Sequence, residues 1–95
     1  MAGILRTPQA NDDLIEIWDR IAKDNLSAAD RLLRRIDETC KLLSRQPEMG
    51  QSQEQYRAGL RSFTVGNYII FYHPIRDGIE VYRILHGARQ WERLL

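Results

Sequence analysis

The sequence predicts a single α+β domain over residues 1–95, with a short N-terminal strand, an antiparallel helical hairpin and a three-stranded antiparallel sheet. The first half of the chain contains two runs in which apolar residues recur at spacings of three and four. The second half is rich in β-branched and aromatic residues and is punctuated by glycine-containing dipeptides. Because 95 residues can bury only one small core, we expect one domain.

The N-terminal half predicts a strand followed by two helices. Residues 3–6 are a short apolar segment, and Thr7-Pro8 then suits a helix start, because threonine caps helices and proline is tolerated in the first turn. We predict the first helix over residues 8–24, with a core-facing stripe of Ala10, Leu14, Ile17, Trp18 and Ile21. Its opposite face is polar, and we interpret the acidic residues near its start as a solvated first turn rather than a metal site: Asp12, Asp13 and Glu16.

The second helix is predicted to begin at Ser27, because Ser27 and Asp30 resemble a capping box. It stops before Gln46-Pro47, and its apolar residues are Ala29, Leu32, Leu33, Ile36, Cys40 and Leu43. The short link between the helices implies an antiparallel hairpin. Residues 47–58 are mostly polar, and we interpret them as a surface loop.

The C-terminal half predicts three consecutive antiparallel strands, at residues 60–65, 68–73 and 79–85. Gly66-Asn67 and Asp77-Gly78 suit tight turns between them. In the middle strand both faces are largely apolar, with Tyr68, Ile70 and Tyr72 on one face and Ile69, Phe71 and His73 on the other. One face must cover the helices. We expect the other to leave apolar surface for a partner, unless the tails and the 47–58 loop fold over it.

Composition favours a protein-binding role. Twelve of the 14 basic residues are arginine, yet the net charge is only +1 and the pI is near 7.9, which is not the profile of a dedicated nucleic-acid-binding domain. Arginine is favoured at interfaces because its planar guanidinium is preorganised. The single Cys40 excludes a disulfide framework and a zinc finger, and no membrane-spanning or signal-peptide run occurs, so we expect a cytoplasmic protein without a metal or cofactor.

Five segments, in this order and spacing, carry a resemblance that covers residues 8 to 91: Asp13-Leu14-Ile15-Glu16-Ile17-Trp18, Pro47-Glu48-Met49-Gly50, Gly59-Leu60-Arg61-Ser62-Phe63, Gly66-Asn67-Tyr68-Ile69-Ile70-Phe71-Tyr72 and Val81-Tyr82-Arg83-Ile84-Leu85-His86-Gly87-Ala88-Arg89. The chain resembles the ParE branch of the RelE/ParE toxin superfamily. The resemblance implies the toxin of a type II toxin–antitoxin system, held inactive by a cognate ParD-like antitoxin whose C-terminal segment folds as it wraps the toxin. It also implies inhibition of DNA gyrase by binding, without enzymatic activity or sequence-specific nucleic-acid binding by the toxin alone.

The main alternative is a ribosome-dependent mRNA endonuclease, as in the sister RelE branch. Arg61, Arg83 and Arg89 would supply cations for such chemistry and His86 a proton carrier. The RelE-like enzymes, however, carry lysines before the second sheet strand and a tyrosine in the C-terminal tail. This chain has no lysine in residues 46–60 and no tyrosine after residue 82, so the resemblance favours gyrase. An unrelated target, an inactive toxin and a structural module of a larger assembly remain as further alternatives.

The residues that we predict to contact the target or the antitoxin are Arg61, Tyr68, Arg83, His86, Arg89, Trp91 and Arg93. Arginine and tryptophan are enriched in interface hot spots. Each has a structural alternative. Arg83 could extend from the sheet edge or pair with Glu80, His86 could be a hydrogen-bonded structural residue, and Trp91 could dock a short tail on the core together with Leu94 and Leu95.

Overall fold

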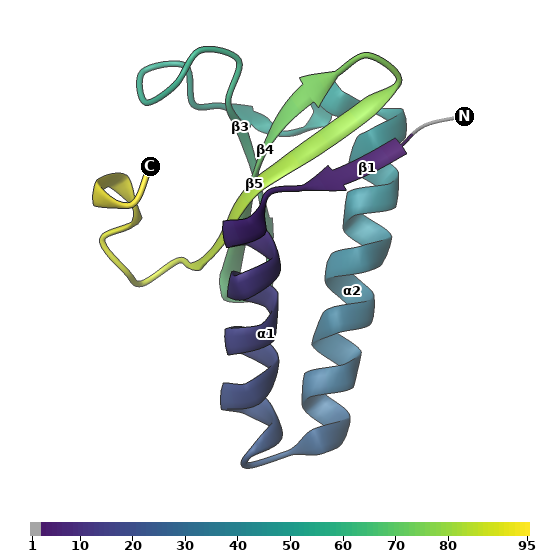
Figure 1. Ribbon diagram of the computed structural model, residues 1–95, viewed down its shortest axis with the longest axis vertical. Helices are drawn as coiled ribbons and strands as arrows, with labels where there is room; N and C mark the ends of the chain where they lie inside the picture. Colours follow the sequence, from purple (N-terminus) through teal and green to yellow (C-terminus); the bar gives the residue numbers. More distant parts are fainter. Residues whose placement is uncertain (1–2) are drawn as a thin grey trace.

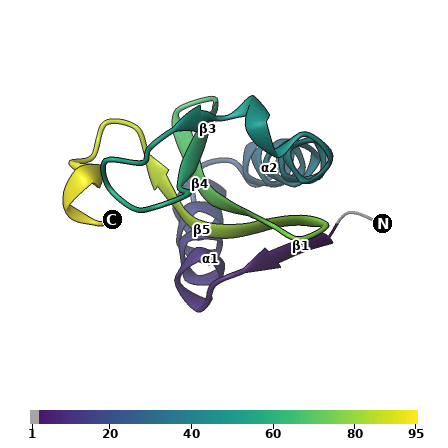
Figure 2. The same cartoon turned by 90° about the horizontal axis from the view of Figure 1, so that it is seen from above.

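The computed structural model describes residues 3–95, so residues 1–2 of the predicted domain lie outside it. A helical hairpin packs against one face of a five-stranded sheet, and the C-terminal tail lies on the other side of the sheet (Figure 1, Figure 2). The elements are β1 (Gly3–Arg6), α1 (Pro8–Ala22), α2 (Leu26–Arg45), a 3-10 turn (Pro47–Met49), β2 (Gln51–Ser52), β3 (Arg61–Val65), β4 (Tyr68–Ile75), β5 (Gly78–His86) and a second 3-10 turn (Trp91–Arg93).

The predicted meander forms the centre of the sheet, whose strand order is β1-β5-β4-β3-β2. A strand flanks it at each edge: β1 is the predicted N-terminal strand, and β2 was not predicted. The N-terminal strand runs parallel to β5, with Gly3 opposite Gly78. The segment predicted as a surface loop contributes β2, and its Gln53 is buried with its amide nitrogen 3.0 Å from the Ser62 hydroxyl. The surface-loop prediction was therefore wrong at two points. Residues 51–52 are exposed but pair with β3 as an edge strand, and Gln53 is buried because its side chain has a buried partner.

Of the two predicted helix caps, one is confirmed and the other is wrong. Thr7 caps α1 as predicted, since its hydroxyl accepts from the Ala10 backbone N–H at 3.1 Å. The second helix begins one residue before the predicted Ser27 because its cap is Asn25, whose side chain accepts from the Ala28 N–H at 3.0 Å. The earlier asparagine satisfies the same unpaired helix N–H groups that a serine cap would satisfy.

The inner core lies between the helices and the sheet face that carries Tyr68, Ile70 and Tyr72, as the strand alternation predicts. The helices contribute Ala10, Ile17, Ile36, Cys40 and Leu43 to it. Trp18, which was predicted as core, is only half-buried and lies outside this cluster. Its indole N–H donates to the Asp30 carboxylate at 3.0 Å, so an amphipathic side chain placed at the hairpin surface keeps its polar group paired.

The outer sheet face is covered by the chain itself. Leu60, Phe71 and Leu85 are buried there beneath the tail residues Trp91, Leu94 and Leu95. Tyr56 from the loop before β3 meets Trp91 edge-on, with ring centroids 5.4 Å apart. The expectation of free apolar surface on this face was therefore wrong, and the tail-and-loop alternative is correct, because three large tail side chains remove the strand residues from water.

Among residues 3–95, no helix is both long enough and apolar enough to span a membrane.

Candidate partner-binding surfaces

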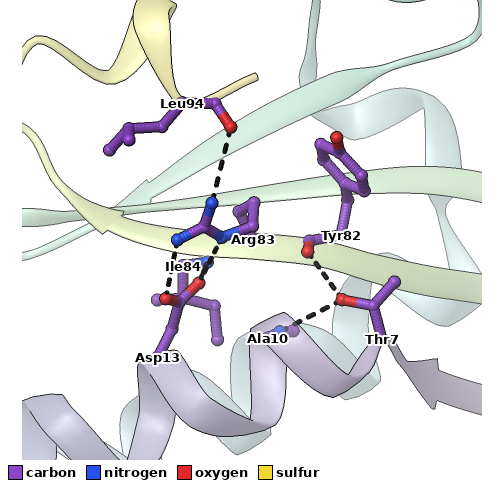
Figure 3. Close-up of polar contacts among 7 residues, drawn as sticks. All are labelled: Thr7, Ala10, Asp13, Tyr82, Arg83, Ile84 and Leu94. Carbon is purple, nitrogen blue, oxygen red and sulfur yellow. Dashed lines mark hydrogen bonds and ion pairs between the residues drawn. The ribbon is translucent and has the colours of Figure 1, made fainter.

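The first site is an ion pair between α1 and the open edge of β5. The strand β1 pairs with β5 only as far as Val81, so the edge of β5 beyond that point faces α1. There one Asp13 carboxylate oxygen accepts from the Ile84 backbone N–H at 3.0 Å and from Arg83 Nε at 2.8 Å, while the other accepts from Arg83 Nη2 at 3.0 Å (Figure 3). The Asp13 side chain thus takes the place of a neighbouring strand.

This pair corrects two predictions. Asp13 is 8% exposed rather than solvated, and the partner of Arg83 is Asp13 rather than Glu80. The hydrogen bonds to Asp13 raise the pKa of Arg83, although partial burial acts in the opposite direction. Removing one partner of a buried ion pair typically costs about 3–5 kcal/mol, so the contact is a strong constraint on the position of α1.

Tyr68, His86 and Arg89 meet beside this pair, around a hollow of about 20 Å³. That volume holds roughly one water molecule and excludes a small-molecule ligand. The His86 ring packs edge-on against Tyr68 with centroids 5.1 Å apart, and its Nδ1 accepts from the Ala88 N–H at 3.0 Å. These two contacts hold the His86 ring at the end of β5.

The other predicted residues lie elsewhere. Arg61 donates to the Gly50 carbonyl at 3.0 Å, beside β2. Trp91 is half-buried against Phe71, with ring centroids 5.1 Å apart, whereas Arg89 and Arg93 are exposed. The predicted residues thus occupy three places: the α1–β5 contact, the β2–β3 edge and the tail.

The sequence did not predict a groove that lies between α1 and α2. Two hollows of about 340 and 230 Å³ both include Leu14 and Leu33, so they form one continuous apolar groove. Ile15, which is 62% exposed, and Trp18 line one end, and Arg6, Arg34 and Asp37 line the end near β1. Helical periodicity assigned the apolar residues of both helices to one core. Ile15, which lies off the predicted core stripe, was the available signal that part of α1 faces a groove.

A polar cluster on the outer side of β4 and β5 was also missed. The Arg57 guanidinium lies 4.6 Å above the Tyr82 ring and donates to the Tyr82 hydroxyl at 3.1 Å. His73 packs edge-on against the same ring, with centroids 5.6 Å apart. Burial lowers the pKa of His73, and the nearby Arg57 lowers it further, so the imidazole is neutral at neutral pH. Beside it, a hollow of about 420 Å³ is lined by Glu48, Glu54 and Arg61.

Comparison with known proteins decides the family. The model of the ParE toxins of parDE type II toxin–antitoxin systems matches residues 4–91. The chain belongs to the ParE toxin family. It is 29% identical over 93 residues to Toxin ParE1 of Mycobacterium tuberculosis, a match that covers 96% of this chain and 95% of that protein. It is 30% identical over 81 residues to Toxin ParE1 of Caulobacter vibrioides, covering 84% and 83% of the two chains.

A solved structure supports the fold of this ParE-family toxin. A chain described as the chromosomal ParDE toxin–antitoxin system from P. aeruginosa superimposes with a TM-score of 0.74 at 21% identity, covering 90% of this chain and 96% of that one. The predicted toxin resemblance and the α+β class are thereby confirmed. The protein is a ParE-type toxin of a type II toxin–antitoxin system.

Cys40, the one cysteine of the chain, is buried in the core of this ParE-family toxin. Burial raises the pKa of the Cys40 thiol to about 11, and nearby Asp37 also raises it, so the thiolate is scarce at neutral pH. Within residues 3–95, no three His, Cys, Asp or Glu side chains are arranged to hold a metal ion.

Proposed function

We propose that this ParE-family toxin binds and inhibits DNA gyrase, that it blocks replication without catalysing a reaction itself, and that a ParD-like antitoxin neutralises it in the cytoplasm. Membership of the ParE toxin family over residues 4–91 carries the proposal. The arginine-rich composition, with 12 arginines and two lysines, supports action through interfaces.

The tail is the proposed target-contact surface. Arg89 and Arg93 are exposed on it, while Trp91 faces inward and anchors it to Phe71. An arginine pair on an ordered segment offers bidentate donors to carboxylates at low entropic cost. In this proposal Trp91 contributes by docking the tail, and the two arginines make the contacts with gyrase.

The groove between α1 and α2 is the proposed antitoxin site. Its lining residues on α2 run from Leu33 to Cys40, which is about 10 Å along the helix, or roughly two turns. A helical segment that places apolar residues on Leu14 and Leu33 would bury the groove, and an acidic residue on that segment would suit Arg6 and Arg34. An antitoxin segment that folds as it binds fits such a surface.

Ribosome-dependent RNA cleavage is less well supported. The Arg83 guanidinium, the strongest candidate cation, is engaged by Asp13, and His86 Nδ1 is engaged by a backbone N–H. The hollow beside neutral His73 is lined by Glu48 and Glu54, whose carboxylates would repel an RNA phosphate. These groups favour a binding protein over a phosphodiester-cleaving enzyme.

The order in which DNA synthesis and protein synthesis stop in cells distinguishes gyrase inhibition from RNA cleavage. After induction of the toxin without antitoxin, we expect DNA synthesis to fall before protein synthesis, because a blocked gyrase stops replication forks first. Labelled thymidine and methionine incorporation in the first minutes provide the readout. The double substitution Arg89→Ala/Arg93→Ala should delay the arrest, whereas Arg76→Ala, an exposed arginine on the β4–β5 turn, should not. An earlier fall in protein synthesis would instead point to messenger RNA.

A further inference from the structure

The attachment of the C-terminal tail depends on few contacts. From Gly87 onward its backbone hydrogen bonds, apart from that of the Gly87 N–H to Asn67, join residues 86–94 to one another. No ladder of backbone hydrogen bonds ties residues 88–95 to the sheet. The body of the protein holds the tail through the apolar side chains of Trp91, Leu94 and Leu95. Apolar burial is non-directional, so it retains the tail without fixing its orientation.

One directional contact reaches the tail from the sheet. Arg83 Nη1 donates to the Leu94 carbonyl at 3.4 Å, and the guanidinium lies between the tail and α1 (Figure 3). Its other two nitrogens are held by Asp13 at 2.8 and 3.0 Å. A guanidinium is planar, so fixing two nitrogens fixes the direction of the third. The Arg83 side chain is 19% exposed, and this restricts its alternative rotamers.

We infer that Asp13 is a positioning residue for the toxin's contact with its target: through Arg83 it orients the tail that presents Arg89 and Arg93. Asp13 and Arg89 line the same small hollow, but the hydrogen bonds that Asp13 accepts come from Arg83 and Ile84. Asp13 acts by holding one guanidinium, which in turn holds the last turn of the chain. The inference rests on the proposed function for its consequence on gyrase, but the placement of the tail is measurable without gyrase.

Tail placement can be followed by the fluorescence of Trp91. The chain has two tryptophans, so Trp18→Phe leaves Trp91 as the only indole. In that background we expect Asp13→Asn to shift the emission of Trp91 to longer wavelength and to increase its quenching by acrylamide, because Trp91 leaves the ring of Phe71. Asp12→Asn, one residue away and exposed, is the matched control and should change neither quantity.

A second variant tests the inference in case Asp13→Asn does not fold. Arg83→Lys keeps a positive charge for Asp13 but cannot both bind it in a bidentate manner and donate to Leu94. We expect it to retain a cooperative unfolding transition and to shift the Trp91 emission as Asp13→Asn does. If Asp13→Asn fails to fold, Arg83→Lys decides the question. Unchanged Trp91 emission in the folded variants would overturn the inference.

The consequence for the target is measured with purified gyrase. We expect Asp13→Asn and Arg83→Lys each to raise the toxin concentration for half-inhibition of supercoiling by about tenfold, the order expected when one charge-assisted hydrogen bond is lost. The double variant should be no weaker than either single variant, because both act through one contact. Additive losses would overturn the shared route. A wild-type toxin that leaves gyrase active would refute the proposed function, while the Trp91 shift would still support the positioning of the tail by Asp13.

Discussion

At the scale of single residues, the Pro47-Glu48-Met49-Gly50 segment has a physical explanation. The buried Tyr72 hydroxyl donates to the Pro47 carbonyl at 2.6 Å and accepts from the Gly50 N–H at 3.0 Å. Burial raises the pKa of Tyr72, and the fully buried hydroxyl is satisfied on both sides. A Cβ on Gly50 would overlap that hydroxyl and lie 2.8 Å from the Ser62 carbonyl oxygen. Glycine is required here by space, not by backbone conformation.

Gly50→Ala should therefore destabilise the toxin. We expect the free energy of unfolding to fall by about 2 kcal/mol, the usual cost of forcing an extra carbon into packed surroundings. Urea unfolding followed by circular dichroism gives the value. Gly3→Ala is the control, because the nearest atom to its added Cβ is 3.8 Å away. Equal losses in the two variants would refute the steric explanation.

Residue-level contacts were the least predictable part of the site. The side chains of Asp13 and Arg83 are 70 residues apart in the sequence, and an acidic residue near a helix start is normally solvated. Asp13 lies three residues after Ala10 and four before Ile17, so helical spacing places it on the buried face of α1, whereas Asp12 is exposed. Only the early end of the β1–β5 pairing creates the unpaired N–H of Ile84 that Asp13 satisfies.

At the scale of elements, periodicity and turn chemistry predicted both helices and all three central strands. Gly66-Asn67 forms the β3–β4 turn as predicted, but the β4–β5 turn lies at Arg76-Asp77, one residue before the predicted Asp77-Gly78, and Gly78 begins β5 opposite Ile75. The positions of the edge strands were not predictable in the same way. The parallel pairing of β1 with β5 joins segments from opposite ends of the chain, and β2 contains only two exposed polar residues. Such strands are specified by their neighbours rather than by their own sequence.

The groove between α1 and α2 leads to a prediction about antitoxin binding. Leu33→Glu should weaken binding of the cognate antitoxin by about tenfold or more, because a buried carboxylate would face the apolar segment in the groove. Leu26→Glu, an exposed position at the start of α2 that is not among the residues lining the groove, is the matched control. Isothermal titration of each toxin variant with separately purified cognate antitoxin measures the two affinities. An equal affinity for the two variants would move the antitoxin site away from the groove.

At the scale of the whole molecule, the tail and the groove lie apart. The tail and α2 lie at opposite sides of the molecule in both views, with the sheet between them (Figure 1, Figure 2). The cover formed by the tail was one of two alternatives, because Trp91, Leu94 and Leu95 are spaced among polar residues without a strand or long-helix period. The apolar outer face of β4 predicted free surface for a partner, whereas the tail covers it.

This separation bears on how the toxin works. If the groove receives the antitoxin and the tail contacts gyrase, two elements connect them. Helix α1 lines the groove through Leu14 and reaches the tail through Asp13 and Arg83, and β5 lines the groove through Ile84, next to Arg83. Inhibition and neutralisation would then use different surfaces of one small domain. The proposed inhibition depends first on gyrase being the target.

Supercoiling of relaxed plasmid by purified gyrase is the direct test of whether gyrase is the target of this toxin. We predict that the wild-type toxin inhibits supercoiling, traps gyrase on DNA with double-strand cleavage, and loses both effects when the cognate antitoxin is added in equimolar amount. Normal supercoiling at toxin concentrations that arrest growth when the protein is expressed would contradict the claim.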